Sequence, residues 1–290
     1  MSGAVLVTGA GGNVGREVVR ALLARGVAVR AAVHSRADAR ALGGAEAVRF
    51  DFTDAKTFPP AFAGVDRLFL VRPPAIGNVE RDIRPTIDYA ARAGVRQIVF
   101  LSLLGAERNP LLPHARIEAL LMERGIPWTM LRCGFFMQNL GTTHRDDVVE
   151  HDDLFVPAGN SRTAFIDTRD IGDVAGLALS EPGHEGVAYP LTGSESLTYG
   201  QVAALMSQVL GRPIRYSRPS LLAFAARMRR RGHPWEYVGV MLGVYVSTRL
   251  GQAATVYPDT ADLLGRPPRT MREYVVDHAA LFAPAGNVPA

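Results

Sequence analysis

Short apolar runs alternate with amphipathic stretches along the first half of the chain. Runs rich in β-branched residues predict strands, and the stretches between them have the apolar spacing of helices. Strands that are apolar along their length and separated by helices predict a parallel sheet covered on both faces. The expected strands are AVLVT, VAVRAAV, AVRF, DRLFLV, RQIVFLS and WTMLR, and the expected helices include 14–25, 79–93 and 113–124.

This alternation stops before the middle of the chain. From Ser196 onward the sequence is mostly helical, with one strand-like run at IRYS and a closing helix that has Thr270 as its N-cap. Right-handed crossovers make a doubly wound sheet the simplest topology for the first half. The sequence therefore predicts an α/β protein with a Rossmann-type doubly wound parallel sheet in residues 1–132, to which about 160–192 contribute, and a smaller, mainly helical substrate lobe in 133–290.

A glycine-rich turn, TGAGGNVG, follows the first predicted strand and precedes a predicted helix. Ordered glycine costs more conformational entropy than alanine, so the turn indicates a close approach to the backbone. Amide groups and the positive end of a helix dipole bind a pyrophosphate in this setting. The alternative is a tight turn without a ligand. The βαβ context favours dinucleotide binding by Gly9, Gly11, Gly12, Asn13, Val14 and Gly15.

The residues after the second and third predicted strands bear on which dinucleotide binds. His34, Ser35 and Arg36 stand where an acid would accept the ribose hydroxyls of NAD. Basic and hydroxyl groups suit a 2′-phosphate, so NADP(H) is favoured and NAD(H) stays open; the alternative is that these are exposed loop residues. Asp51 and Phe52 are expected to hydrogen-bond and cover the adenine, although FDFTD could also be a helix cap.

The tyrosine–lysine pair of typical short-chain dehydrogenases is absent. Lys56 is the only lysine, and none of the eight tyrosines begins a YxxxK motif. Ser102 and His114 are the candidate proton donors, since histidine can donate a proton near neutral pH. His114 also lies four residues before Glu118, so a simple pairing of the two is the alternative.

The composition indicates which classes of partner the protein binds and which cell compartment it occupies. A net charge of +4 over 290 residues predicts no nucleic-acid binding, and RMRRR at 227–231 is interpreted as a solvated helix end. No apolar run reaches transmembrane length, so we expect no membrane partner. Cys133 is the only cysteine, which excludes an internal disulfide and fits the cytoplasm. It is expected to be a small core residue rather than a reactive thiol. The histidines show no metal-ligand spacing, so no metal is expected.

Several motifs together resemble the NmrA-like family of atypical short-chain dehydrogenases. They are TGAGGNVG, FLSLLGAE, HARIEALLMERGIPWTMLRCGFFMQNL, FIDTRDIGDVA and LLGRPPRTMREYVVDHAALF, and they run over nearly the whole chain. Within the family, the sequence is most similar to bacterial NAD(P)H:quinone oxidoreductases and ergot-alkaloid-type reductases. Two departures stand out, because His34 replaces a common arginine and Cys133 replaces a common proline.

The resemblance implies a Rossmann domain with a helical lobe, NADP(H) across the switch point, and His114 at the position of a histidine in such quinone reductases. It also implies that a segment after the fourth strand lines the nicotinamide-ribose side, and that a segment after the sixth flanks the nicotinamide and the substrate. The cofactor residues implied are Val71, Arg72, Pro73 and Cys133, and the substrate residues are Phe135, Phe136 and Met137.

The sequence favours an NAD(P)H-dependent reductase of a quinone or quinone-like polycyclic aromatic metabolite. Reduction of a quinone yields a stabilised phenolate and needs little acid assistance, so orientation against the nicotinamide does much of the work. By analogy, such an enzyme would tailor secondary metabolites. The alternative is a non-catalytic NADP(H) redox sensor that regulates a protein partner. The sequence leaves a homodimer open.

Overall fold

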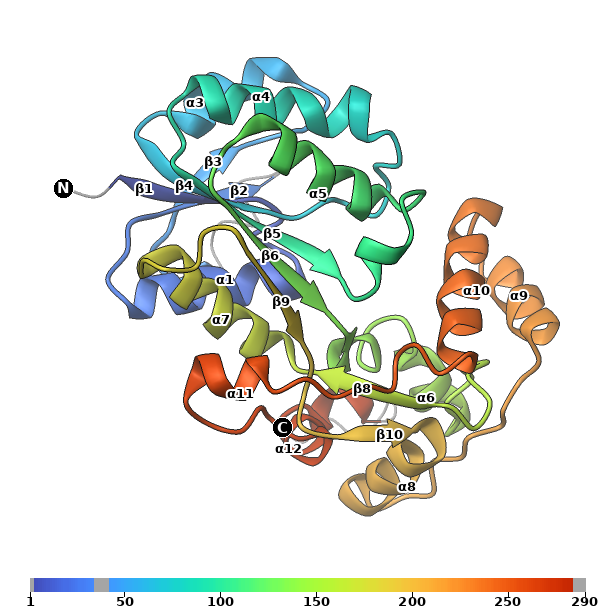
Figure 1. Cartoon of the computed structure of the whole chain (residues 1–290). Coiled ribbons are helices and arrows are strands. Elements are labelled where there is room, and N and C mark those ends of the chain that lie inside the picture. The colour runs from blue at the N-terminus through green and yellow to red at the C-terminus, as the bar shows by residue number, and fades with distance from the viewer. Residues whose placement is uncertain (1–2, 34–41, 284–290) are drawn as a thin grey trace. The chain divides into compact units, whose positions relative to one another are not determined.

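Seven parallel strands form the central sheet of the first of two units (Figure 1). The computed structural model describes residues 3–33 and 42–283. Unit 1 contains residues up to 133, 168–191 and 259–266, and unit 2 contains 134–167, 192–258 and the chain from 267 onward.

The sheet of unit 1 has the strand order β3-β2-β1-β4-β5-β6-β9. Every neighbouring pair is parallel. The order reverses between β1 and β4, which creates a topological switch point at their carboxyl ends. This confirms the Rossmann-type fold predicted from the sequence. The strands are β1 Ala4–Val7, β2 Val29–Val33, β3 Glu46–Arg49, β4 Val65–Leu70, β5 Gln97–Leu103, β6 Trp128–Cys133 and β9 Val187–Leu191.

Helices cover both faces of this sheet (Figure 1). On one face lie α1 (Asn13–Ala24) and α7 (Thr168–Ser180), and on the other lie α3 (Phe58–Phe62), α4 (Arg84–Arg92) and α5 (Pro113–Arg124). The short helix α11 (Asp259–Leu264) packs on α7 and β9. Buried side chains of the sheet and of α3, α4 and α5 form a core that includes Leu68, Phe100 and Leu121.

The helix expected over 79–93 has two parts. Val79–Ile83 forms a π-helical turn, and α4 follows it from Arg84. Pro85 has no N–H group, so it cannot donate the α-helical hydrogen bond to the carbonyl of Arg81. The proline explains why the regular helix begins only at this point.

Unit 2 is built on a three-stranded sheet of order β10-β8-β7. Its core includes Tyr199, Phe224, Tyr245 and Tyr274. The strand expected at IRYS is wrong, because only an isolated bridge joins Arg215 to Asp153. The elements are β7 Phe135–Phe136, α6 Arg145–His151, β8 Arg162–Ile166, β10 Ser196–Thr198, α8 Tyr199–Leu210, α9 Leu221–Arg230, α10 Trp235–Arg249 and α12 Met271–Asp277.

The N-cap expected for the closing helix is confirmed. The Thr270 hydroxyl accepts a hydrogen bond from the Glu273 N–H, and the Glu273 carboxylate accepts one from the Thr270 N–H. This reciprocal pair is a capping box, which satisfies two N–H groups that the helix itself leaves unpaired.

The contact between α1 and α7 depends on glycine, and alanine substitution tests it. A Cβ atom at Gly172 would lie 2.5 Å from the Glu17 Cβ and 2.6 Å from its carbonyl carbon. We expect Gly172→Ala to lower the free energy of unfolding by about 1–3 kcal/mol through overpacking. Gly243→Ala is the matched control, since a Cβ there would meet nothing within 4 Å. It should raise stability by about 0.5–1 kcal/mol because alanine is the better helix former. Urea unfolding measures both changes, and equal effects would contradict the packing argument.

Candidate functional site

The carboxyl ends of β1, β4, β5 and β6 lie at one edge of the unit 1 sheet, where ligands of doubly wound folds bind. The glycine loop follows β1, and Arg72 follows β4 by two residues. Ser102 lies near the end of β5, and Cys133 ends β6. The fold thus brings the predicted cofactor residues of unit 1 to the ends of neighbouring strands.

The glycine loop has a backbone that side chains would obstruct. Gly9 has a φ of +62°, in the left-handed region that favours glycine. The N–H of Gly12 donates to the carbonyl oxygen of Gly9 at 2.9 Å. A Cβ at Gly15 would overlap that same oxygen, whereas a Cβ at Gly11 would meet nothing within 4 Å. The backbone is therefore closely packed at Gly15 and open at Gly11, which leaves room for a phosphate beside the loop.

The first turn of α1 leaves its amide groups available. Gly12 is the N-cap and offers no side chain, and the first turn contains no acidic residue. The N–H groups of a first helical turn have no partner within the helix, so they can bind an anion. The Arg16 guanidinium donates to the carbonyl of Gly11 at 3.2 Å and brings a cation beside the loop. Sequence reasoning missed Arg16, although it directly follows the last motif glycine.

Arg72 brings a second cation to this edge. Its Nη1 donates to the carbonyls of Pro73 and Ile76 at 3.0 and 2.6 Å. Its Nε is buried without a hydrogen-bond partner, and no carboxylate pairs with it among the residues that the structure describes. Burial lowers the pKa of Arg72. Its neighbour Val71 is fixed to β1, because the Val71 N–H donates to the Thr8 hydroxyl at 2.8 Å.

His114 lies in the first turn of α5 and stacks on Phe100, with ring centroids 6.0 Å apart. Burial and, to a lesser extent, the charge of Arg72 lower its pKa from 6.5 to about 4. The imidazole is therefore neutral at pH 7, and its N–H can donate a hydrogen bond. The pairing with Glu118 considered above is wrong, because Glu118 has other partners.

Glu118 is 3% exposed and joins three elements. Its carboxylate accepts hydrogen bonds from Ser102 Oγ at 2.6 Å and from Arg132 Nη2 at 2.7 Å and Nε at 3.1 Å. This pairing fixes α5 against β5 and β6. This hydrogen bond engages the Ser102 proton, so Ser102 is not proposed as a proton donor to a substrate. Neither the partner of Glu118 nor this use of Ser102 is encoded in a local motif.

Cys133 is buried, and its thiol donates to the carbonyl of Leu131 at 3.5 Å. Burial raises the pKa of this thiol, so it stays protonated and is not a nucleophile. A contact between Cys133 and the cofactor stays a prediction.

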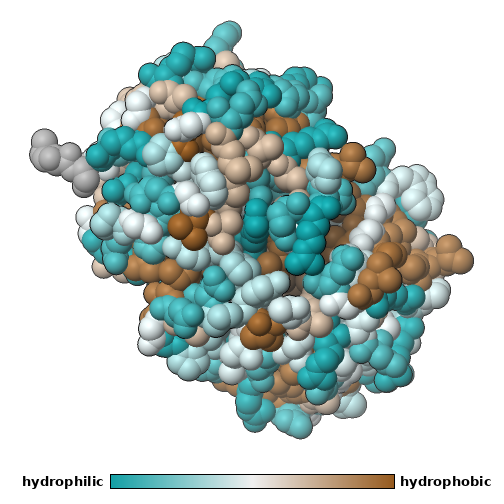
Figure 2. Space-filling model, in the orientation of Figure 1, coloured by the Kyte–Doolittle hydropathy of each residue, from teal (hydrophilic) through white to brown (hydrophobic). Residues whose placement is uncertain are grey.

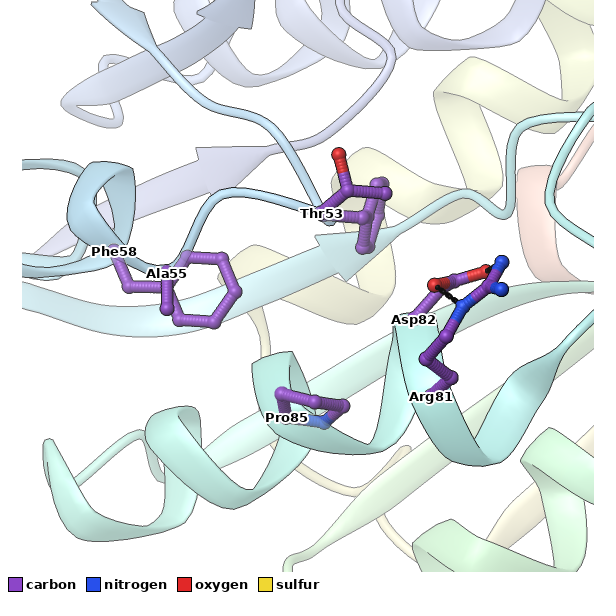
Figure 3. Close-up of a pocket in the computed structure, with 7 residues that line it drawn as sticks. Thr53, Ala55, Phe58, Arg81, Asp82 and Pro85 are labelled. Atoms are coloured by element: carbon purple, nitrogen blue, oxygen red, sulfur yellow. Dashed lines mark hydrogen bonds and ion pairs between the residues drawn. The ribbon is translucent and has the colours of Figure 1, made fainter.

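A cavity of about 310 Å³ opens beside Phe52 (Figure 3). Arg81 and Asp82 form its polar side, with their side chains hydrogen-bonded to each other at 2.6 and 2.8 Å. Asp51 does not line it; one Asp51 oxygen accepts two hydrogen bonds from Thr53 at 2.8 Å. The other lining residues are Thr53, Ala55, Phe58 and Pro85. The polar pair was missed because it lies on the π-helical turn, far from the glycine motif in sequence.

The remaining predicted residues lie either outside the described part of the chain or in unit 2. His34, Ser35 and Arg36 lie outside the described residues. In unit 2, Phe135 is half-buried and its ring lies 6.5 Å from Phe165 and 6.4 Å from Tyr245.

Phe136 is half-buried as well, whereas Met137 is 2% exposed within the core of unit 2. The Met137 side chain is thus used for packing, and the expected substrate contact at this position is not retained.

Among residues 3–33 and 42–283, no helix is long and apolar enough to cross a membrane, and no group of three or more His, Cys, Asp or Glu side chains is placed to hold a metal ion.

Comparison with known families agrees with this geometry. The model of the NmrA-like family matches residues 1–257. The chain belongs to the NmrA-like family. The match includes the glycine loop, the segment of Arg72 and helix α5.

Curated NmrA-like relatives cover almost the full chain. The NAD(P)H azoreductase of Xenophilus azovorans is 34% identical over 97% of this chain and all of its own. Quinone oxidoreductase 2 of Escherichia coli is 30% identical over 93% of this chain and 97% of its own. The structure of the E. coli NADPH-dependent quinone oxidoreductase complexed with NADPH has a TM-score of 0.84 at 29% identity, covering 95% of this chain and 99% of that one.

Two alanine substitutions test the loop as a cofactor cradle. We expect Gly15→Ala to weaken NADPH binding by at least about tenfold and to lower the melting temperature, because the new methyl displaces the Gly9 carbonyl. Gly11→Ala should leave the melting temperature of the free protein unchanged, since the added methyl enters open space. It should still weaken NADPH binding if a phosphate approaches this backbone closely. Calorimetric titration and thermal unfolding measure both, and wild-type affinity in Gly15→Ala would contradict the assignment.

Proposed function

We propose that this protein transfers hydride from NADPH to a planar, quinone-like acceptor, with the cofactor held by unit 1. The protein is an NAD(P)H-dependent oxidoreductase of the NmrA-like type, with NADP(H) as its cofactor. The observation that carries the proposal is the cradle of backbone amides at the start of α1; Arg72, which has no carboxylate partner among the described residues, follows the neighbouring strand β4.

Several described residues of unit 1 have the chemistry that a dinucleotide requires. The loop of Gly9–Val14 and the first amides of α1 would hold the pyrophosphate, with Arg16 adding positive charge. Arg72 has no carboxylate partner among the described residues, so its guanidinium would add positive charge beside the dinucleotide. Phe52 and the Arg81–Asp82 side of the cavity suit a flat base with polar edges. Val71 and Pro73 are proposed for the ribose on the nicotinamide side.

The bound nicotinamide would supply the hydride, and the chain's own groups would orient the acceptor and bind its developing charge. His114 is the proposed hydrogen-bond donor to an acceptor oxygen. A neutral imidazole donates through N–H without transferring a full proton, a mode known from other enzymes in which burial or a helix N-terminus lowers the histidine pKa. A quinone needs no stronger acid, because its reduced form is a stabilised phenolate.

The acceptor we propose is a quinone or a quinone-like polycyclic aromatic metabolite, reduced during secondary-metabolite tailoring. Planar or conjugated acceptors are suggested by the names of relatives, which include the azoreductase, the quinone oxidoreductase and agroclavine dehydrogenase of Claviceps fusiformis. Phe135 and Phe136 are the proposed aromatic contacts. They follow Cys133 by two and three residues and keep part of their surface exposed.

The direct test is to add quinones and azo dyes to the purified protein with NADPH or NADH and follow the nicotinamide absorbance. We expect consumption that depends on the protein, with NADPH preferred. Tight NADPH binding without consumption across the whole panel would contradict the proposed reductase activity and favour the alternative function as a redox sensor. If the protein binds neither cofactor, the assignment of the glycine loop as the cofactor site is wrong.

Substitution of His114 tests its role as a neutral donor. We expect His114→Leu to lower kcat by about tenfold or more, while His114→Gln, which keeps an N–H donor, retains more activity. NADPH affinity should change little in either variant. Equal kcat in wild type and His114→Leu would remove His114 from the mechanism.

The lowered pKa of His114 also predicts the pH dependence. In the folded protein the group titrates near pH 4 rather than 6.5, so kcat/KM should show no step from His114 between about pH 6 and 8. The unfolded chain binds the proton more readily. The stability contributed by the neutral imidazole is therefore fully present above about pH 6.5 and is lost as the pH falls towards 4. A step near pH 6.5 that disappears in His114→Gln would contradict this environment.

A further inference from the structure

Helix α10 is apolar around its whole circumference but is buried on one side only. No charged residue occurs between Glu236 and Arg249. The buried side chains are Val238, Tyr245 and Thr248, which face the core of unit 2. A helix that is hydrophobic all round is normally covered all round, so its outer side calls for a partner.

The outer side of α10 and the adjoining α9 form a hydrophobic surface (Figure 2). Leu222 on α9 is 84% exposed, and Trp235, Val240 and Leu250 on or next to α10 are 62%, 66% and 70% exposed. Large exposed apolar patches of this kind mark interaction sites. We call these four residues, with Val244 and Val246, the α9–α10 face.

Unpaired cations adjoin this face. Residues 218–250 contain six arginines but only one acid, Glu236. Two of them, Arg227 and Arg231, share the single carboxylate of Asp147 at 2.6 and 2.8 Å. The other four are exposed and have no carboxylate partner within the described part of the chain: Arg218, Arg229, Arg230 and Arg249.

Arg229 connects the charged and the apolar parts of the surface. Its guanidinium lies 5.0 Å from the ring centroid of Trp235. Tryptophan prefers the boundary between water and lipid, and arginine beside it pairs with headgroup phosphates. The combination of exposed aliphatic side chains, a boundary tryptophan and exposed arginines without carboxylate partners is typical of helices that lie in a membrane interface.

We propose that the α9–α10 face docks on the surface of an anionic lipid bilayer. A second copy of the chain on the same face would bring unpaired arginines against one another, whereas anionic headgroups neutralise them and the acyl boundary covers the aliphatic residues. The contact is with the surface, because no described helix is long and apolar enough to span. The proposal differs from the expectation of no membrane partner and from the interpretation of 227–231 as a solvated helix end.

Vesicle flotation without cofactor or acceptor tests this proposal separately from the reductase function. The protein should bind vesicles of phosphatidylcholine with phosphatidylglycerol, bind pure phosphatidylcholine much more weakly, and dissociate as salt is raised. Arg229→Glu/Arg230→Glu should weaken binding by at least about tenfold. The charge-matched control Arg92→Glu/Arg272→Glu alters exposed arginines elsewhere and should weaken it far less.

The apolar contribution is tested in the same assay. Leu222→Ser/Val240→Ser keeps every charge and should also weaken binding by about tenfold. Met122→Ser/Val276→Ser changes side chains that are 52% and 55% exposed elsewhere and should leave binding unchanged. Equal losses in the face and control variants would overturn the proposal, as would no binding to anionic vesicles.

Trp235 reports directly on docking because the chain has only one other tryptophan, Trp128. In Trp128→Phe, anionic vesicles should shift the emission to the blue, and brominated lipids should quench it. Trp235→Phe in the otherwise native chain should abolish the lipid-induced change, which covers the case in which Trp128→Phe folds poorly. Self-association that Leu222→Ser/Val240→Ser disrupts, without any lipid-induced change at Trp235, would instead identify a second copy as the occupant and overturn the proposal.

Discussion

The close approach of α1 to the end of β1 is the constraint on which the cofactor site depends. Gly15 permits it on one side, since any larger residue there would overlap the Gly9 carbonyl. On its other side α1 packs closely on α7, because Gly172 and Gly176 have no side chains that would collide with Glu17 and Ala21. The helix is thus held in place by backbone contacts, and its unpaired N–H groups have a fixed direction. Rigid donors of this kind bind a phosphate without losing further conformational entropy.

A second constraint fixes α5, which carries His114. The buried Glu118 ties this helix to Ser102 of β5 and Arg132 of β6, so its N-terminal turn cannot shift without breaking charged hydrogen bonds. Burial and Arg72 then keep His114 neutral. The ion pair between the buried Glu118 and the half-buried Arg132 therefore fixes the position of α5, and the neutral His114 is left for the proposed hydrogen bond to the acceptor. Of the two candidate proton donors, Ser102 is thus engaged in a structural hydrogen bond, and His114 is the residue proposed to bind the acceptor.

Much of the fold was predictable because its signals are local. Helix 113–124 begins at a proline and ends before the left-handed Gly125, and the glycine loop combines a strand, a tight turn and a helix start within a few residues. The partner of Glu118 was not predictable, because Arg132 is on another strand and only the parallel register of β5 and β6 brings it near Ser102. Met137 looked like a substrate residue beside two phenylalanines, but its neighbours in the core come from distant segments of unit 2. The unpaired state of Arg72 likewise depends on which carboxylates the fold leaves out of reach.

The central claim is that unit 1 holds NADPH in one orientation and that its hydride reaches an acceptor. Turnover of NADPH deuterated on one face at C4, with a quinone as acceptor, tests this most directly through mass analysis of the NADP⁺ formed. A fixed cradle predicts that the deuterium is either wholly lost or wholly retained, with the complementary result for label on the other face. A mixture of both from a single labelled cofactor, or no turnover at all, would contradict the account.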